Sequence, residues 1–223
     1  MQLRTRSLEK WAGLANALGG ICLAALFVLH PGGGDPPSVE AALSPAYGLE
    51  HTLGLAAMAL LILGLPALAV RLAWSTNSAT RVACALAFLG DYLLGGVIFF
   101  DAYFVPSIAA NAPAMLAATG PLNTPPVVLA DALPGVVWGL GYIVLAAIAL
   151  ATRTFPRAAS GLVLLGGILV NLPPQPIGPA PLWLIALGSV VMGAGLAWWG
   201  LVLGTTVVTT HVAHQPRPAA AST

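Results

Sequence analysis

The chain has 223 residues, of which 58% are apolar and 7% are charged, and its mean hydropathy is +0.91. Soluble domains carry about 25% charged residues, so this composition excludes a water-soluble protein and predicts an integral membrane protein whose main partner is the lipid bilayer. Eight Lys and Arg against seven Asp and Glu give a formal net charge of +1. That balance excludes the basic surface on which a nucleic-acid-binding function would depend.

Six apolar segments are candidates for membrane spans. A hydrocarbon core of about 30 Å requires roughly 20 apolar residues in a helix that rises 1.5 Å per residue. In chain order the segments are residues 11–29, 51–74, 82–104, 126–151, 158–172 and 182–203. None alternates apolar and polar residues as a barrel strand does. The sequence therefore predicts an all-α polytopic membrane protein, a bundle of six transmembrane helices in which the fifth is barely long enough to span.

Prolines mark where three of these spans end. The first, third and fifth spans reach His30-Pro31, Val105-Pro106 and Leu172-Pro173. Proline disfavours the helical conformation in the residue before it, which predicts a helix end at each place and three successive helical hairpins. Pro66 lies inside the second span, where its missing N–H predicts a kink.

The basic residues all fall on one side of the predicted spans. They are Arg4, Arg6, Lys10, Arg71, Arg81, Arg153, Arg157 and Arg217. The positive-inside rule makes that side cytoplasmic. Both termini are therefore predicted to lie on the cytoplasmic side of a cell membrane, such as a bacterial inner membrane. Residues 1–10 are then a basic cytoplasmic N-terminus, residues 11–208 the transmembrane domain, and residues 209–223 a disordered cytoplasmic tail.

Small residues four positions apart predict where the helices pack. Lipid offers no hydrophobic reward for helix association, so helices in a membrane associate through close backbone approach and polar contacts. Gly135 with Gly139, and Gly200 with Gly204, are two GxxxG pairs. We expect them to serve packing within the chain. A homo-oligomer seam, or a face for a partner in a membrane complex, is the alternative.

Asp91 is predicted to lie near the middle of the third span. It follows Arg81 by ten residues, which is about 15 Å of helix and half of the hydrocarbon core. A carboxylate at that depth costs at least about 2.5 to 3.5 kcal/mol on insertion scales, so its side chain should face the bundle interior. Two interpretations stay open: a group that couples a proton or cation to transport, or a structural acid hydrogen-bonded to a neighbouring helix.

A second polar group collects on the side that lacks Lys and Arg. Its candidate site residues are His30, Glu50, His51, Asp101 and Asp131, and the first loop adds Asp35 and Glu40. Uncompensated carboxylates attract cations and raise one another's affinity for protons, and imidazole with carboxylate suits a divalent metal such as Zn²⁺. No motif places two of these ligands on one helical face. Glu50 and His51 are adjacent, about 100° apart on a helix, and could share an ion only at a frayed helix end.

The function that the sequence favours is not catalytic. It is the binding or transport of a small cation, a proton or an apolar solute through an outward-facing acidic vestibule above Asp91. The first alternative is a membrane-embedded, metal-dependent enzyme that acts on a lipid-like substrate with His30, His51, Asp101 or Asp131. The second is a structural accessory subunit of a membrane complex. No cofactor is expected beyond the divalent metal of that first alternative.

Overall fold

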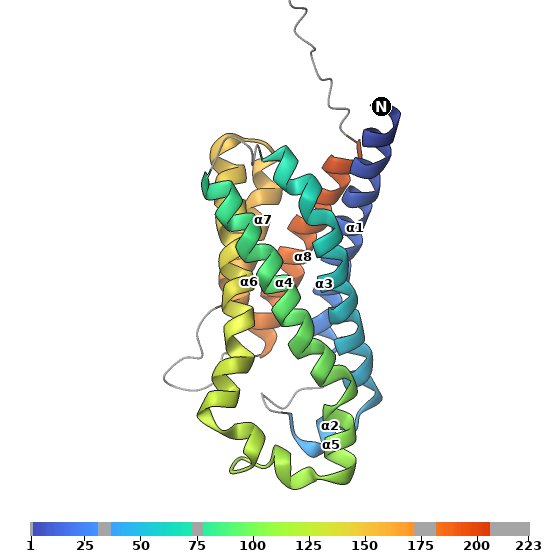
Figure 1. The fold of residues 1–223 in the computed structure, drawn as a ribbon, viewed down its shortest axis with the longest axis vertical. Coiled ribbons are helices and arrows are strands. Elements are labelled where there is room, and N and C mark those ends of the chain that lie inside the picture. The colour runs from blue at the N-terminus through green and yellow to red at the C-terminus, as the bar shows by residue number, and fades with distance from the viewer. Residues whose placement is uncertain (1, 31–36, 73–77, 172–181, 206–223) are drawn as a thin grey trace, which may run out of the picture.

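The computed structural model describes residues 2–30, 37–72, 78–171 and 182–205. Every regular element in these ranges is a helix (Figure 1). In chain order the elements, with η for short 3-10 helices, are α1 (Gln2–Val28), α2 (Val39–Ala42), α3 (Pro45–Arg71), α4 (Ser78–Tyr103), α5 (Val105–Asn111), η1 (Pro113–Leu116), η2 (Pro121–Asn123), α6 (Pro125–Thr152), α7 (Arg157–Val170) and α8 (Leu182–Thr205). The expectation of a disordered tail at 209–223 lies outside the described residues.

The protein is a multi-pass membrane protein built from helices. Within the described residues, 5 helices are long and apolar enough to cross a membrane. Their outer faces carry exposed large apolar side chains such as Leu63, Leu129 and Leu201, as a surface in contact with lipid requires. The predicted fifth span corresponds to α7, whose 14 residues reach about 21 Å of a core about 30 Å thick. Six full crossings therefore stay a prediction.

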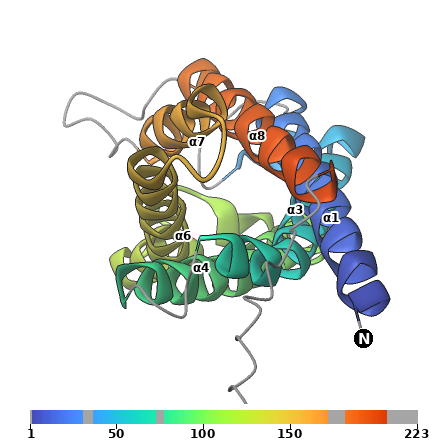
Figure 2. The same cartoon turned by 90° about the horizontal axis from the view of Figure 1, so that it is seen from above.

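The helices α1, α3, α4, α6, α7 and α8 form a closed ring, which Figure 2 shows from above. Going around it, α1 packs on α3, α3 on α4, α4 on α6, α6 on α7, α7 on α8, and α8 on α1. The helices of each predicted hairpin pack on each other, as the pairs α1–α3, α4–α6 and α7–α8. Whether the third pair is a full transmembrane hairpin stays a prediction together with the sixth crossing.

The described basic residues from Lys10 onward lie at one end of the ring and most acidic residues at the other, with Glu9 at the basic end and Asp91 in the interior as the exceptions. α1 begins, α3 ends and α6 ends at the upper end of Figure 1. We call this the arginine end, after Arg71, Arg81, Arg153 and Arg157. The opposite end, which we call the histidine end, carries His30, Glu50, His51, Asp101 and Asp131. The predicted separation of charge is thus present, and the compartment that each end faces stays a prediction.

The ring closes because α1 and α8 touch backbone to backbone. A Cβ atom on Gly20 would stand 2.5 Å from the carbonyl oxygen of Gly193 and 2.7 Å from the nitrogen of Ala197. A Cβ on Gly200 would overlap the backbone of Gly13. The GxxxG pair that begins at Gly200 therefore serves packing within the chain, as small residues do in membrane bundles.

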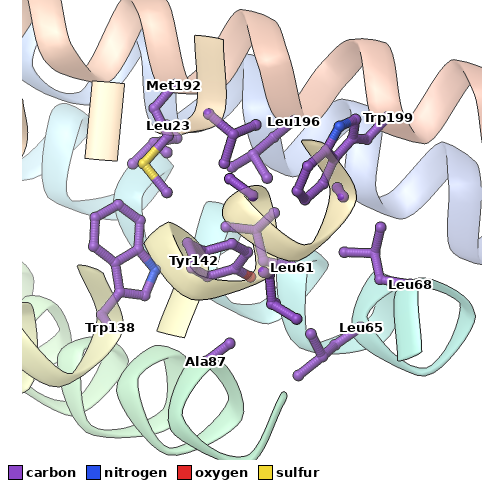
Figure 3. Close-up of a cluster of buried hydrophobic side chains, with 14 of the residues drawn as sticks. Leu23, Leu61, Leu65, Leu68, Ala87, Trp138, Tyr142, Met192, Leu196 and Trp199 are labelled. Carbon is purple, nitrogen blue, oxygen red and sulfur yellow. The ribbon is translucent and has the colours of Figure 1, made fainter. Parts of the chain in front are cut away.

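Large side chains fill the centre of the ring (Figure 3). Trp138 and Tyr142 of α6, Leu61 of α3, and Leu196 and Trp199 of α8 are each at most 2% exposed. A smaller second core covers the histidine end and consists of Ala42, Tyr47, Val105, Ala109 and Leu116. In the described residues, the centre of the ring is thus filled by packed side chains.

Candidate functional site

The start of α3 sets the geometry of the histidine end. Ser44 caps this helix, because its Oγ accepts a hydrogen bond from the backbone N–H of Ala46 at 3.3 Å. Pro45 suits the first helical position, where a backbone N–H has no partner to lose. The helix therefore starts at Pro45 instead of His51. Glu50 and His51 therefore lie in a formed second turn instead of opening the helix, and the frayed end that a shared ion would have required is absent at these two residues.

Two imidazoles converge there on one carboxylate. Nδ1 of His30, just beyond α1, lies 2.6 Å from Oε1 of Glu50, and Nδ1 of His51 lies 2.7 Å from the same oxygen. The Glu50 side chain is only 1% exposed. A buried carboxylate needs hydrogen-bond donors in place of water, and the two histidines provide them.

The contacts of His51 decide which of its ring nitrogens carries a hydrogen. Nδ1 also lies 2.8 Å from the carbonyl oxygen of Tyr47. A carbonyl oxygen only accepts, so Nδ1 must be the donor, and Nε2 of the neutral ring is then an acceptor. This Nε2 lies 3.7 Å from Oδ2 of Asp101 on α4. Two acceptors therefore face each other across a gap longer than a hydrogen bond, and a proton on either one would attract the other electrostatically.

Tyr47 completes the surroundings of His51. Its ring lies 4.1 Å from the His51 ring, measured between centroids, and its side chain is buried. The His30 ring approaches His51 from the residues that follow α1, with ring centroids 6.1 Å apart. The imidazole of His51 is thereby held in one orientation between α1, α3 and α4.

Asp101 lies between this network and a small open pocket. The pocket has a volume of about 70 Å³, and Asp101 and Asp131 line it together with apolar side chains such as Val105 and Leu116. Asp101 is 24% exposed, in contrast to buried Glu50. The volume is enough for a few water molecules. The acidic groups thus lead from a buried network to a pocket that water can enter.

The structure brings the predicted outer residues together. His30, Glu50, His51 and Asp101 form one contact network, and Asp131 shares the pocket with Asp101. Among the loop acids, Glu40 lies exposed on α2, and Asp35 is outside the described residues. Tyr47 was not among the predicted site residues. The Ser44-Pro45 signal for an earlier helix start would have placed it one turn before His51.

Asp91 lies apart from this network, fully buried between α4 and α6. Nε1 of Trp138 donates a hydrogen bond to its Oδ1, and the hydroxyl of Tyr142 donates one to its Oδ2, both at 2.9 Å. Trp138 and Tyr142 are four residues apart on α6, so they lie on the same helical face. Neither donor was predicted from the sequence. Along α4, about 15 Å of helix separates Asp91 from Asp101.

Glycines let α4 and α6 come close enough for these bonds. A Cβ atom on Gly90 would overlap Cα of Trp138, and one on Gly141 would overlap the backbone nitrogen of Ala87. Side chains at either position would force the helices apart. The small residues beside Asp91 thus set the distance that its two hydrogen bonds need.

The described side chains do not form a metal-binding site by themselves. Within the described ranges, no group of three or more His, Cys, Asp or Glu side chains is placed to hold a metal ion. In comparisons with known proteins, no protein family, curated protein or solved structure matches the chain.

Proposed function

We propose that this membrane protein binds protons at its histidine end and exchanges them with the adjacent aqueous phase, with His51 as the central group. The observation that carries the proposal is that each ring nitrogen of His51 faces a carboxylate, Glu50 at Nδ1 and Asp101 at Nε2. Histidine is the side chain whose ordinary charge change falls between about pH 5 and 8. The site therefore combines a proton acceptor with two groups that stabilise the proton once it is bound.

The proton reaches His51 from the pocket. Asp101 and Asp131 line this pocket and concentrate cations near it. Nε2 of His51 and Oδ2 of Asp101 are 3.7 Å apart, so a proton taken up by Asp101 passes to His51 through one bridging water or after the carboxyl group moves into hydrogen-bond range. The resulting imidazolium lies between Glu50 and Asp101, so the net charge of these three side chains changes from −2 to −1. His30, which contacts the same Glu50 oxygen, stabilises that carboxylate in both states.

The size and charge of the pocket support a proton or a small cation as the ligand. Sites for organic molecules have volumes of about 300 to 1,000 Å³, whereas this pocket has about 70 Å³. An apolar solute, which the sequence also allowed, does not fit in it. Anions are disfavoured because the described part of the histidine end contains acidic residues and histidines but no Lys or Arg.

The packed interior of the ring favours proton binding at one end over conduction of protons through the ring. Trp138, Tyr142 and Trp199 are buried at the centre, and both oxygens of Asp91 already accept hydrogen bonds. In this proposal Asp91 is a structural acid that joins α4 to α6. The coupling role that the sequence allowed for Asp91 is then the competing hypothesis.

The test is a pH titration of the full-length protein in nanodiscs, followed by ¹⁵N NMR of the imidazoles. His211 and His214 in the tail are replaced by Gln, so that only His30 and His51 report. We expect the His51 ring to change protonation state during the titration and its midpoint to fall in Asp101→Asn, because the negative charge beside Nε2 is removed. The matched control is Glu40→Gln, an exposed acid at the same end, which should leave the midpoint unchanged.

Two results would overturn the proposal. One is a His51 ring that keeps the same protonation state throughout the titration. The other is a midpoint that Asp101→Asn and Glu40→Gln leave equally unchanged, because Asp101 would then have no part in proton binding. Helical circular dichroism of each variant ensures that only folded protein is compared.

A further inference from the structure

A groove lies at the arginine end, on the outside of the ring between α1 and α3. The two helices touch where Gly64 faces Asn16, since a Cβ on Gly64 would stand 2.8 Å from Cβ of Asn16. Beyond this contact the first turns of α1 project from the ring (Figures 1 and 2). A groove of about 710 Å³ opens there between α1 and α3. It is independent of the proton site, which lies at the opposite end.

The lining of this groove is almost wholly apolar. Trp11 and Leu14 of α1 and Leu63 and Val70 of α3 line it, and all four side chains are exposed. Because α1 and α3 are membrane-spanning helices, exposed apolar side chains on their outer faces meet lipid. The occupant of the groove is therefore a lipid rather than a water-soluble molecule.

The length of the groove corresponds to one leaflet. On α1 its lining runs from Leu8 to Leu18, and on α3 from Leu60 to Arg71. These ranges cover ten and eleven residue steps, about 15 Å of helix each, which is half of a hydrocarbon core about 30 Å thick. An acyl chain of the leaflet at the arginine end has the right place and direction to fill it.

Two opposite charges belong to the same groove. Glu9 of α1 and Arg71, the last residue of α3, both line it. Neither makes an ion pair with another side chain in the described part of the chain. A guanidinium binds phosphate through parallel hydrogen bonds, and a carboxylate accepts hydrogen bonds from an ammonium group. Together the two side chains match a head group that carries both charges.

We propose that this groove binds one phospholipid of the phosphatidylethanolamine class. Its phosphate binds Arg71, its ammonium group binds Glu9, and an acyl chain lies along Trp11, Leu14 and Leu63. Phosphatidylglycerol has no ammonium group and would leave Glu9 beside a net negative lipid. Phosphatidylcholine carries a quaternary ammonium without N–H donors, so it cannot donate a hydrogen bond to Glu9.

Trp11 provides the signal for a test, because brominated acyl chains quench the fluorescence of an indole that they touch. The full-length protein is reconstituted in phosphatidylcholine vesicles that contain increasing fractions of brominated phosphatidylethanolamine or brominated phosphatidylglycerol. Subtraction of the signal of Trp11→Phe isolates Trp11 from the other tryptophans. We expect half-saturation at a several-fold lower fraction of phosphatidylethanolamine than of phosphatidylglycerol.

Substitutions separate the two head-group contacts. Arg71→Gln should raise the fraction of phosphatidylethanolamine at half-saturation about tenfold, as expected for the loss of a charge-assisted contact. Glu9→Gln should remove the preference for phosphatidylethanolamine over phosphatidylglycerol. The matched control is Arg157→Gln, an exposed arginine at the same end, at the start of α7, and it should leave both curves unchanged.

Equal quenching by the two brominated lipids in the unmodified protein would overturn the proposal, since the groove would then contact lipid without selection. An unchanged half-saturation in Arg71→Gln would overturn it too. If Arg71→Gln loses its helical circular dichroism signal, Arg71→Lys replaces it, because Lys keeps the charge but not the paired hydrogen bonds. That variant should raise half-saturation several-fold, and an unchanged curve again contradicts the proposal.

Discussion

The indole Nε1 of Trp138 donates a hydrogen bond to Oδ1 of Asp91 at 2.9 Å, across the interface between α4 and α6. The hydroxyl of Tyr142 donates a hydrogen bond to the second carboxyl oxygen. Both oxygens of the fully buried Asp91 side chain therefore accept a hydrogen bond. In a bilayer, each buried polar group that lacks a partner costs several kcal/mol. These two bonds explain how a carboxyl group is accommodated at this depth, and they join the helices of the middle hairpin.

Asp91→Asn should therefore lower stability without changing proton binding at the histidine end. The amide has one accepting oxygen, which the donor-only indole of Trp138 needs; its NH₂ group then donates to the Tyr142 hydroxyl oxygen, and the hydroxyl hydrogen of Tyr142 loses its acceptor. The expected cost is about 1 to 3 kcal/mol, measured by unfolding in a mild detergent. Tyr142→Phe, which removes one donor and keeps the carboxyl, serves as the reference. Loss of proton binding with unchanged stability would instead support the coupling role of Asp91.

Two glycines on α4 should respond differently to Ala. A Cβ on Gly90 would overlap Trp138, whereas a Cβ on Gly96 meets nothing within 4 Å. We expect Gly90→Ala to destabilise the protein by about 1 to 3 kcal/mol, the usual cost of overpacking. Gly96→Ala should be neutral or slightly stabilising, because Ala favours helix over Gly. Equal melting temperatures of the two variants would contradict the backbone contact between α4 and α6.

The hydrogen of neutral His51 should be found on Nδ1. This tautomer follows from the carbonyl oxygen of Tyr47, 2.8 Å away, which can only accept a hydrogen bond. The ¹⁵N shifts of the imidazole, measured at a pH where the ring is neutral, distinguish the two tautomers. In Glu50→Gln the Nδ1–H form should persist, since the Tyr47 contact remains. A predominant Nε2–H form would show that the Tyr47 contact is absent.

The two ends of the ring should face different compartments. Asn111, at the end of α5, and Arg157, at the start of α7, are both exposed and lie at opposite ends. With Cys22 and Cys84 replaced by Ala, single cysteines are introduced at 111 and 157. The positive-inside rule predicts that an impermeant maleimide labels position 111 on intact cells and position 157 only after lysis. Labelling of both on intact cells would contradict the predicted crossings.

Purified protein should contain no stoichiometric transition metal. The Nδ1 atoms of both His30 and His51 are directed at Glu50, which leaves a metal at most one nitrogen of each ring. Elemental analysis of protein purified without chelators measures this directly. One zinc per chain that disappears in His51→Ala would instead favour the metal-dependent enzyme that the sequence left as an alternative.

The site shows where prediction from the sequence stopped. The sequence located His30, Glu50, His51, Asp101 and Asp131 at one end of the bundle, because each lies near the end of an apolar segment. It did not show that two histidines share one oxygen of Glu50. That contact depends on the α3 start at Pro45, which brings a further turn of helix to the histidine end.

By itself the amino-acid sequence determined the class of the protein, the approximate positions of its long apolar helices and the gathering of arginines at one end. Hydropathy and charge are properties of a local segment, and the bilayer responds to them segment by segment. Only the tertiary structure decided that Trp138 and Tyr142 meet Asp91 and that His51 lies between Glu50 and Asp101. Such contacts depend on how each helix is rotated and tilted against its neighbours. Close packing at glycines such as Gly90 sets that rotation, and no single segment encodes it.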